Sequence, residues 1–202
     1  MAFLLGDVSG KGIGAALLMA NLQATIRGQQ HLTKDPAKLM QRVNYLFFES
    51  TRPEHFATLF YGVYDAATHT IRYVSCGHPS AVLLRASGDV ELLDATATVL
   101  GAFKNRGFEE RSVELQSGDR LVLFSDGFSE SQLDALTEEE SDQWAVRTIV
   151  SLGASHSDQA SHQNELAGAL AAAAAASMTA WGGQQADDIT VMDLRILNSD
   201  FC

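Results

Sequence analysis

Residues 120–130 read Arg-Leu-Val-Leu-Phe-Ser-Asp-Gly-Phe-Ser-Glu, an apolar run that leads to Asp126 and Gly127. The run has the length and composition of a buried strand, and the glycine lets the backbone turn after the aspartate. A buried strand therefore delivers a carboxylate to its end. Because an aspartate at a strand end is often only a turn or cap residue, this stretch alone makes Asp126 a candidate and nothing more.

Two further strand ends carry aspartates. Residues 2–6 are apolar and lead to Asp7, while Asp187 and Asp188 open the last strand expected in the chain. Hard divalent cations prefer oxygen ligands, and carboxylates placed by rigid strands supply them at fixed geometry. Three such strand ends in one domain favour a shared metal site, so we expect the carboxylates of Asp7, Asp126 and Asp187 to converge.

The remaining sequence separates into helical and extended stretches. Apolar residues at helical spacing predict four helices: 15–30, 36–50, a stretch from about residue 141, and 165–179. Short apolar or alternating runs between turn residues predict eight strands: 2–6, 55–64, 70–76, 81–85, 90–93, 109–115, 120–124 and 188–197. We expect 109–115 and 120–124 to pair across a tight turn. Strands grouped mid-chain with helices at either end favour an α+β fold over regular βαβ alternation.

The helix expected over 36–50 has the clearest start signal. Asp35 is expected to be its N-cap, and Pro36 suits the first helical position. The residues expected to form its buried face are Leu39, Met40, Val43 and Leu46.

A dinucleotide-binding alternative comes from the glycine-rich stretch near the start of the chain. Gly10, Gly12 and Ala15 match the fingerprint G-x-G-x-x-G/A, and Asp35 lies 20 residues beyond Ala15. The acidic residue of that fingerprint should end a second strand. Asp35 is instead expected to cap a helix, which argues against a nucleotide-binding enzyme.

Composition sets further bounds on function. The chain has 202 residues and a formal net charge of −11, and it shows no basic stretch of the kind that binds nucleic acid. No apolar run reaches the about 18 residues typical of a membrane span. With Cys76 and Cys202 as the only cysteines, a disulfide framework is excluded and a reducing, cytoplasmic setting is the default expectation. The length suits one domain, and no linker is visible.

Six short motifs follow one another along the chain: Gly6-Asp7-Val8-Ser9-Gly10-Lys11-Gly12, Phe56-Ala57-Thr58-Leu59-Phe60-Tyr61-Gly62, Cys76-Gly77-His78-Pro79, Leu100-Gly101, Gly118 to Gly127, and Asp187-Asp188-Ile189-Thr190. Their order resembles that of the bacterial SpoIIE/RsbU-like branch of the PPM phosphatases. The resemblance covers nearly the whole chain. It implies an αββα sandwich of two antiparallel sheets flanked by helices, formed as a single catalytic domain by residues 1–202.

The resemblance also implies a metal site and a reaction. By analogy Asp7 would bridge two Mn²⁺ or Mg²⁺ ions, and the carbonyl of Val8 would ligate one of them. Asp126 and Asp187 would complete the shell of the other ion, with Asp188 beside it. The family uses a metal-bound water to attack phosphoserine or phosphothreonine directly, without a phospho-enzyme. Asp7, Asp126 and Asp187 are therefore the expected catalytic residues.

The resemblance further implies a phosphorylated protein as substrate, often an anti-sigma-factor antagonist, and a sensor or receiver domain upstream. No nucleic-acid or membrane partner is expected. The family carries another acidic ligand upstream of its Gly-Asp-Val-Ser-Gly motif, and this sequence starts too late to contain it. We therefore expect a chain that lacks the family's first strands and has one incomplete ion site. A phosphatase-like module that binds a partner with little turnover is the alternative.

Overall fold

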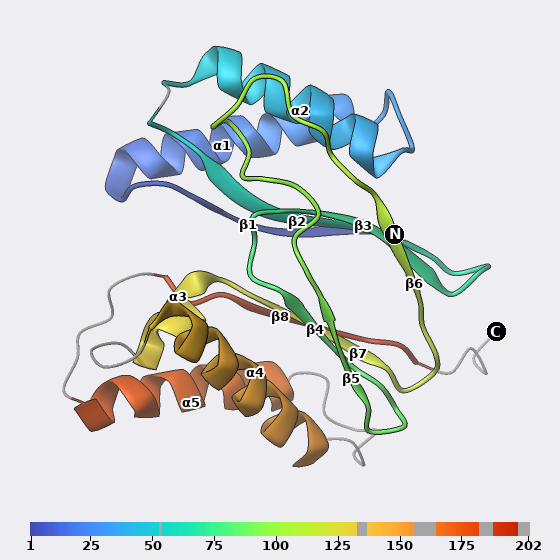
Figure 1. Ribbon diagram of the computed structural model, residues 1–202, viewed down its shortest axis with the longest axis vertical. Helices are drawn as coiled ribbons and strands as arrows, with labels where there is room; N and C mark the ends of the chain where they lie inside the picture. The colour runs from blue at the N-terminus through green and yellow to red at the C-terminus, as the bar shows by residue number, and fades with distance from the viewer. Residues whose placement is uncertain (53, 133–136, 156–164, 182–187, 198–202) are drawn as a thin grey trace. The chain divides into compact units, whose positions relative to one another are not determined.

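The computed structural model describes residues 1–52, 54–132, 137–155, 165–181 and 188–197. The chain groups into two compact units, each built from two separate segments (Figure 1). Unit 1 consists of residues 1–78 and 94–114, and unit 2 consists of residues 79–93 and 115–202. None of the helices in the described part of the chain is both long and apolar enough to cross a membrane.

Unit 1 is a four-stranded antiparallel sheet with two helices on one face (Figure 1). Its strands, in sheet order, are β1 (Ala2–Val8), β2 (Ala57–Asp65), β3 (Thr70–Cys76) and β6 (Arg111–Glu114). The helices are α1 (Gly12–Gln29) and α2 (Pro36–Ser50). Strand β1 runs two residues further than the sequence predicted, so Asp7 and Val8 lie within it, and α1 already includes Gly12 and Gly14.

The side chains of the unit 1 sheet alternate between two faces. One face packs on the helices in a core that includes Val8, Leu22, Ile26, Met40, Val43, Phe47, Leu59, Tyr61 and Val74. On the other face Phe60 stacks between Phe3 and Tyr73, with ring centroids 6.2 and 5.1 Å from it. Since successive residues point to opposite faces, the buried position of Val8 directs Asp7 to the face away from the helices.

Helix α2 begins as the sequence predicted. It starts at Pro36, and the carboxylate of Asp35 accepts a hydrogen bond of 3.0 Å from the backbone N–H of Lys38. Because Asp35 caps a helix and ends no strand, the dinucleotide-binding alternative fails. Leu39, Met40 and Val43 are buried as predicted. The prediction for Leu46 was wrong: the residue is 38% exposed. At about 100° per residue it falls just outside the arc of the helix that runs from Leu39 to Met40 and holds the buried apolar side chains.

A buried amide on α2 holds a loop that the sequence gave no reason to single out. The side chain of Asn44 donates to the carbonyl oxygens of Phe103 (2.9 Å) and Lys104 (3.3 Å). Its carbonyl oxygen accepts from the N–H of Gly101 at 2.9 Å. Asn44 is only 1% exposed and its bond to Gly101 is buried, whereas Phe103 and Lys104 are themselves exposed residues.

We expect Asn44→Ala to destabilise the protein by about 3 kcal/mol, since it removes three hydrogen bonds and leaves the buried N–H of Gly101 without an acceptor. Urea unfolding followed by circular dichroism would measure this. The matched control is Gln41→Ala, an exposed position on the same helix, which should change stability by less than about 0.5 kcal/mol. Equal losses in the two variants would show that the amide does not hold the loop.

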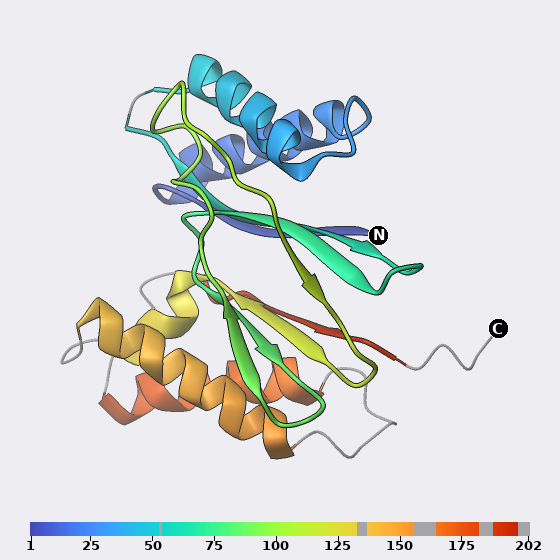
Figure 2. The ribbon, with the colours of Figure 1, turned by 45° about the vertical axis from the view of Figure 1, so that its right-hand side comes forward.

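Unit 2 is a second four-stranded antiparallel sheet with helices on one face (Figure 2). Its strands, in sheet order, are β5 (Val90–Leu93), β4 (Ala81–Leu84), β7 (Arg120–Phe124) and β8 (Val191–Arg195). Its helices are α3 (Asp126–Ser129), the short 3₁₀ turn η1 (Glu130–Gln132), α4 (Glu138–Ser155) and α5 (Glu165–Trp181). The alanine-rich α5 packs through Leu166, Leu170 and Ala174, spaced four residues apart. The expected α+β class with two antiparallel sheets, each flanked by helices, is confirmed.

The pairing expected between 109–115 and 120–124 is wrong. Strand β6 pairs with β3 in unit 1, whereas β7 pairs with β4 and β8 in unit 2. The turn before β7 explains the difference, because the buried carboxylate of Asp119 accepts hydrogen bonds from the backbone of Gln116 and Ala86 and from Arg85, each at 2.9 Å. These bonds hold the start of β7 to the β4–β5 hairpin instead of to β6.

Candidate functional site

The end of β1 places the first predicted ligand in unit 1. Asp7 is half-buried and lies opposite Thr58 of β2 in the antiparallel register. The carbonyl of Val8 belongs to the last residue of the strand, and its side chain is in the core. Cross-strand neighbours share a face of the sheet, so Asp7 and Thr58 lie on the same side.

The turn after β1 depends on hydrogen bonds and on two glycines. Ser9 donates its N–H to the carbonyl of Phe56 (2.9 Å), and its hydroxyl accepts from the N–H of Phe56 (3.0 Å). Gly10 and Gly12 have φ of 95° and 73°, a region that side-chain-bearing residues rarely adopt. The glycines of this motif therefore have a backbone role in the turn between β1 and α1.

A buried histidine lies beside the same strand pair and was not predicted as a site residue. The Oγ1 of Thr58 and the Nδ1 of His78 are 3.0 Å apart in a hydrogen bond, and His78 is 3% exposed. Its Nε2 is buried and makes no hydrogen bond within the described residues. Burial lowers the pKa of His78 to about 4, so the imidazole is neutral at physiological pH. The Gly77-His78-Pro79 motif was the only sequence signal for it.

This burial predicts a pH dependence of stability. In the unfolded chain the pKa of His78 returns to about 6.5. Between about pH 6.5 and pH 4 the unfolded state therefore binds a proton at His78, whereas the folded state does not. Stability should therefore fall as pH drops from 7 to 4, by up to about 3 kcal/mol from this residue.

Urea unfolding of the protein and of His78→Gln at pH 7 and pH 5 measures this contribution. The variant should lose less stability over this interval than the parent, since glutamine does not titrate. Equal losses would show that His78 is accessible to protons in the folded state.

The end of β7 places the second predicted ligand, in unit 2. Asp126 is half-buried at the first position of α3, and its Oδ1 accepts a 2.8 Å hydrogen bond from the N–H of Gly127. The sequence predicted Asp126 to lie at the end of the strand. It is instead held by a short helix that the sequence did not predict, with Phe128 buried beneath it.

The residue before Asp126 joins two of the predicted motifs. The hydroxyl of Ser125 donates to the carbonyl of Asp188 (3.0 Å) and accepts from the N–H of Thr190 (2.9 Å). The N–H of Ser125 also donates to the carbonyl of Thr190 at 3.0 Å. Ser125 itself is buried at 5% exposure, whereas Asp188 and Thr190 are exposed. Within unit 2 these bonds bring the Asp188 segment next to the end of β7, two residues before Asp126.

The structure does not place every predicted ligand. Asp187 lies outside the described residues, and Asp188 is exposed. Taking each unit by itself, the described residues gather no group of three His, Cys, Asp or Glu side chains that could hold a metal ion. Asp7 belongs to unit 1, whereas Asp126 and Asp188 belong to unit 2, so the convergence of Asp7, Asp126 and Asp187 stays a prediction. The donors themselves are all oxygens, which fits Mn²⁺ or Mg²⁺.

Comparison with solved structures defines the class of fold. The PP2C phosphatase domain of SpoIIE from Bacillus subtilis superposes with a TM-score of 0.77, at 22% identity, over 96% of this chain and 54% of that chain. The catalytic domain of the serine/threonine phosphatase PstP in complex with two manganese ions matches with a TM-score of 0.68, at 14% identity, over 98% of this chain and 88% of that one. At these identities the likeness shows that the fold is of the PP2C type.

Comparison with protein families gives the narrower assignment. The family described as Stage II sporulation protein E (SpoIIE) matches residues 1–197. The chain therefore belongs to the SpoIIE family, as the six motifs indicated. The phosphoserine phosphatase RsbP of Bacillus subtilis (strain 168) is 33% identical over 125 residues, which are 60% of this chain and 31% of RsbP. The chain spans about a third of the length of the curated relatives it matches, 31% and 39%.

Proposed function

We propose that this chain is a metal-dependent phosphatase domain that hydrolyses phosphoserine or phosphothreonine on a protein partner. The observation that carries the proposal is membership of the SpoIIE family over residues 1–197, together with a relative named as a phosphoserine phosphatase. We further propose that units 1 and 2 work as one catalytic domain, because a single family pattern spans both.

The proposed ligands are Asp7, Asp126, Asp187 and Asp188, with the backbone carbonyl of Val8. They offer the oxygen donors that hard cations prefer, and two Mn²⁺ or Mg²⁺ ions are the proposed cofactors. Such ions, when bound, lower the pKa of water and neutralise charge on a phosphoryl group.

The chain's own residues would hold this donor set in place. Ser125 fixes the backbone at Asp188 and Thr190, which leaves the carboxylate of Asp188 exposed. The Gly127 N–H orients the carboxylate of Asp126 by binding Oδ1. Carboxylates oriented by such hydrogen bonds hold metals more strongly than freely rotating ones. The buried hydroxyl of Ser125 is thus proposed as a positioning group, with no contact to substrate.

The proposed substrate is a phosphorylated signalling protein such as an anti-sigma-factor antagonist. The support is the resemblance to the SpoIIE/RsbU-like branch, and an upstream sensor or receiver domain is a proposal of the same kind. The cytoplasmic location rests on cysteine usage alone and stays a prediction. A folded chain that binds Mn²⁺ but does not dephosphorylate a phosphoserine peptide would favour the alternative, a binding module with little turnover.

Asp126→Asn tests the proposed function. We expect Mn²⁺-dependent hydrolysis of p-nitrophenyl phosphate and of a phosphoserine peptide to fall by about 100-fold or more, because the amide removes the charge that holds the cation. The melting temperature without metal should be unchanged, since the amide oxygen can still accept from the Gly127 N–H. Glu139→Gln, the same charge change at an exposed position of α4, is the matched control. Normal turnover by Asp126→Asn at low Mn²⁺ would exclude Asp126 as a ligand.

Ser125→Ala tests the positioning role separately. It should weaken Mn²⁺ binding by about 10- to 100-fold, measured by isothermal titration calorimetry, because the Asp188 segment loses two hydrogen bonds to β7. Ser131→Ala removes another buried hydroxyl of unit 2, one that donates to the Phe128 carbonyl (2.8 Å), and should lose stability without losing Mn²⁺ affinity. The same loss of affinity in both variants would mean that Ser125 acts only through stability.

A further inference from the structure

A pocket of about 400 Å³ lies between the β4–β5 hairpin and the C-terminal part of α4, entirely within unit 2. This volume falls in the range of small-molecule sites in proteins. Its lining is mixed: Leu84, Val90, Val150, Gly153 and Ala154 are apolar or small, whereas the charged residues are Arg85, Arg120, Arg195 and Asp89. None of these residues belongs to the proposed metal site.

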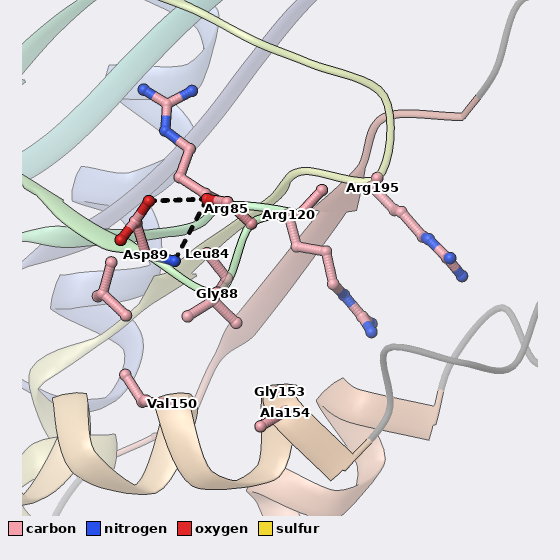
Figure 3. Close-up of a pocket in the computed structure, with 13 residues that line it drawn as sticks. Leu84, Arg85, Gly88, Asp89, Arg120, Val150, Gly153, Ala154 and Arg195 are labelled. Atoms are coloured by element: carbon pink, nitrogen blue, oxygen red, sulfur yellow. Dashed lines mark hydrogen bonds between the residues drawn. The ribbon is translucent and has the colours of Figure 1, made fainter.

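Two guanidinium groups come together on one side of the pocket. Arg120 of β7 and Arg195 of β8 lie directly opposite each other in the antiparallel register. Figure 3 shows their side chains side by side and pointing the same way, whereas Arg85 points away from them. The guanidinium group of Arg85 binds the carboxylates of Asp119 (2.9 Å) and Glu91 (2.6 Å).

An ion pair within the sheet holds the guanidinium group of Arg120 in place. Arg120 forms a buried ion pair with Asp193, which includes a 3.3 Å bond from its Nε, and its side chain is 11% exposed. This pair fixes the plane of the Arg120 guanidinium next to Arg195.

On the apolar side of the pocket α4 approaches β4 closely. A Cβ atom added at Gly153 would lie 2.3 Å from the Cδ1 of Leu84, so the Leu84 side chain would have to shift. Val90 is 41% exposed on the opposite wall. The pocket therefore pairs an apolar surface that opens to solvent with a cationic end.

The sequence makes the position of these arginines unusual. Unit 2 contains four Lys or Arg residues against sixteen Asp or Glu residues, and three of the four, Arg85, Arg120 and Arg195, line this pocket. The fourth, Arg147, is exposed on α4 and lies outside the lining. Positive charge in the unit is thus concentrated around one cavity.

The pocket is separate from the candidate metal ligands of unit 2. Arg120 begins β7, and about 13 Å of strand lie between it and Phe124, which leads to Asp126. Arg195 likewise ends β8, whereas Asp188 precedes the start of that strand. A ligand bound here would sit at the opposite end of the unit 2 sheet from Asp126 and Asp188.

We propose that this pocket binds a carboxylate carried on an apolar group. The carboxylate lies against Arg120 and Arg195, whose planar guanidinium groups match its geometry. The apolar group packs on Leu84, Val90 and Val150. A free carboxylic acid and the C-terminus of a peptide share this chemistry, and the site does not depend on phosphatase activity.

Titration of the full chain with N-acetyl-leucine and N-acetyl-leucinamide, followed by NMR, tests the proposal. The two probes differ only in the carboxylate, and we expect the acid to bind at least tenfold more tightly. Arg195→Gln should lose that preference, and Ala154→Leu, which fills the pocket from an exposed position of α4, should weaken both probes at least tenfold. Equal affinity of the acid and the amide would overturn the proposal.

Arg147→Gln is the matched control, because it removes the one arginine of unit 2 that does not line the pocket. It should leave binding of the acid unchanged, and a loss equal to that of Arg195→Gln would show a general charge effect and refute the site. Tighter binding of isobutyl phosphate than of N-acetyl-leucine would refute the carboxylate assignment. The same titration with a leucine-terminated peptide, as free acid and as amide, shows whether the pocket also binds the C-terminal carboxylate of a peptide.

Discussion

The buried carboxylate of Asp119 fixes the start of β7, and much of unit 2 follows from it. At 1% exposure a carboxylate is stable only when its oxygens are hydrogen-bonded, and Asp119 accepts from two backbone N–H groups and from Arg85. These bonds join the turn before β7 to the β4–β5 hairpin. They hold the start of β7, with Arg120, at the β4–β5 hairpin, and the far end of the strand leads to Asp126.

Strand β7 thus serves two ends of unit 2 with different chemistry. At its C-terminal end the strand leads to Ser125, which binds the backbone of Asp188, and to Asp126, and these two aspartates are among the ligands proposed for a cation. At its N-terminal end Arg120 faces Arg195 across the ladder, which suits an anion. The five buried residues from Arg120 to Phe124 keep the two ends at a fixed separation.

The sequence predicted the elements that local signals define. The bounds of α2, β3, β5 and β7 match, because caps, turn residues and apolar runs lie within each stretch. It failed on the partner of β6, which is chosen by contacts with β3 far away in the chain. The sequence also singled out Asp7, Asp126 and Asp187, because each follows or precedes an apolar run.

The residues that support the candidate site were not visible in the sequence. Ser125 and Asn44 act through hydrogen bonds to residues 63 and 59 positions away, and no local pattern encodes such bonds. His78 appeared only as part of a short motif, and its burial and lowered pKa come from packing. The spacing of apolar residues predicts which face of a helix or strand is buried, but it does not predict which other element packs against that face.

The way the chain is divided between its units has a consequence for its folding. The chain passes from one unit to the other after residues 78, 93 and 114, so neither unit is encoded by one continuous stretch. Unit 1 cannot complete its sheet until β6 has been synthesised, after both strands of the β4–β5 hairpin. Long-range pairings of this kind slow folding. A ribosome must therefore release most of the chain before either sheet closes, and no simple truncation of the gene would yield one unit alone.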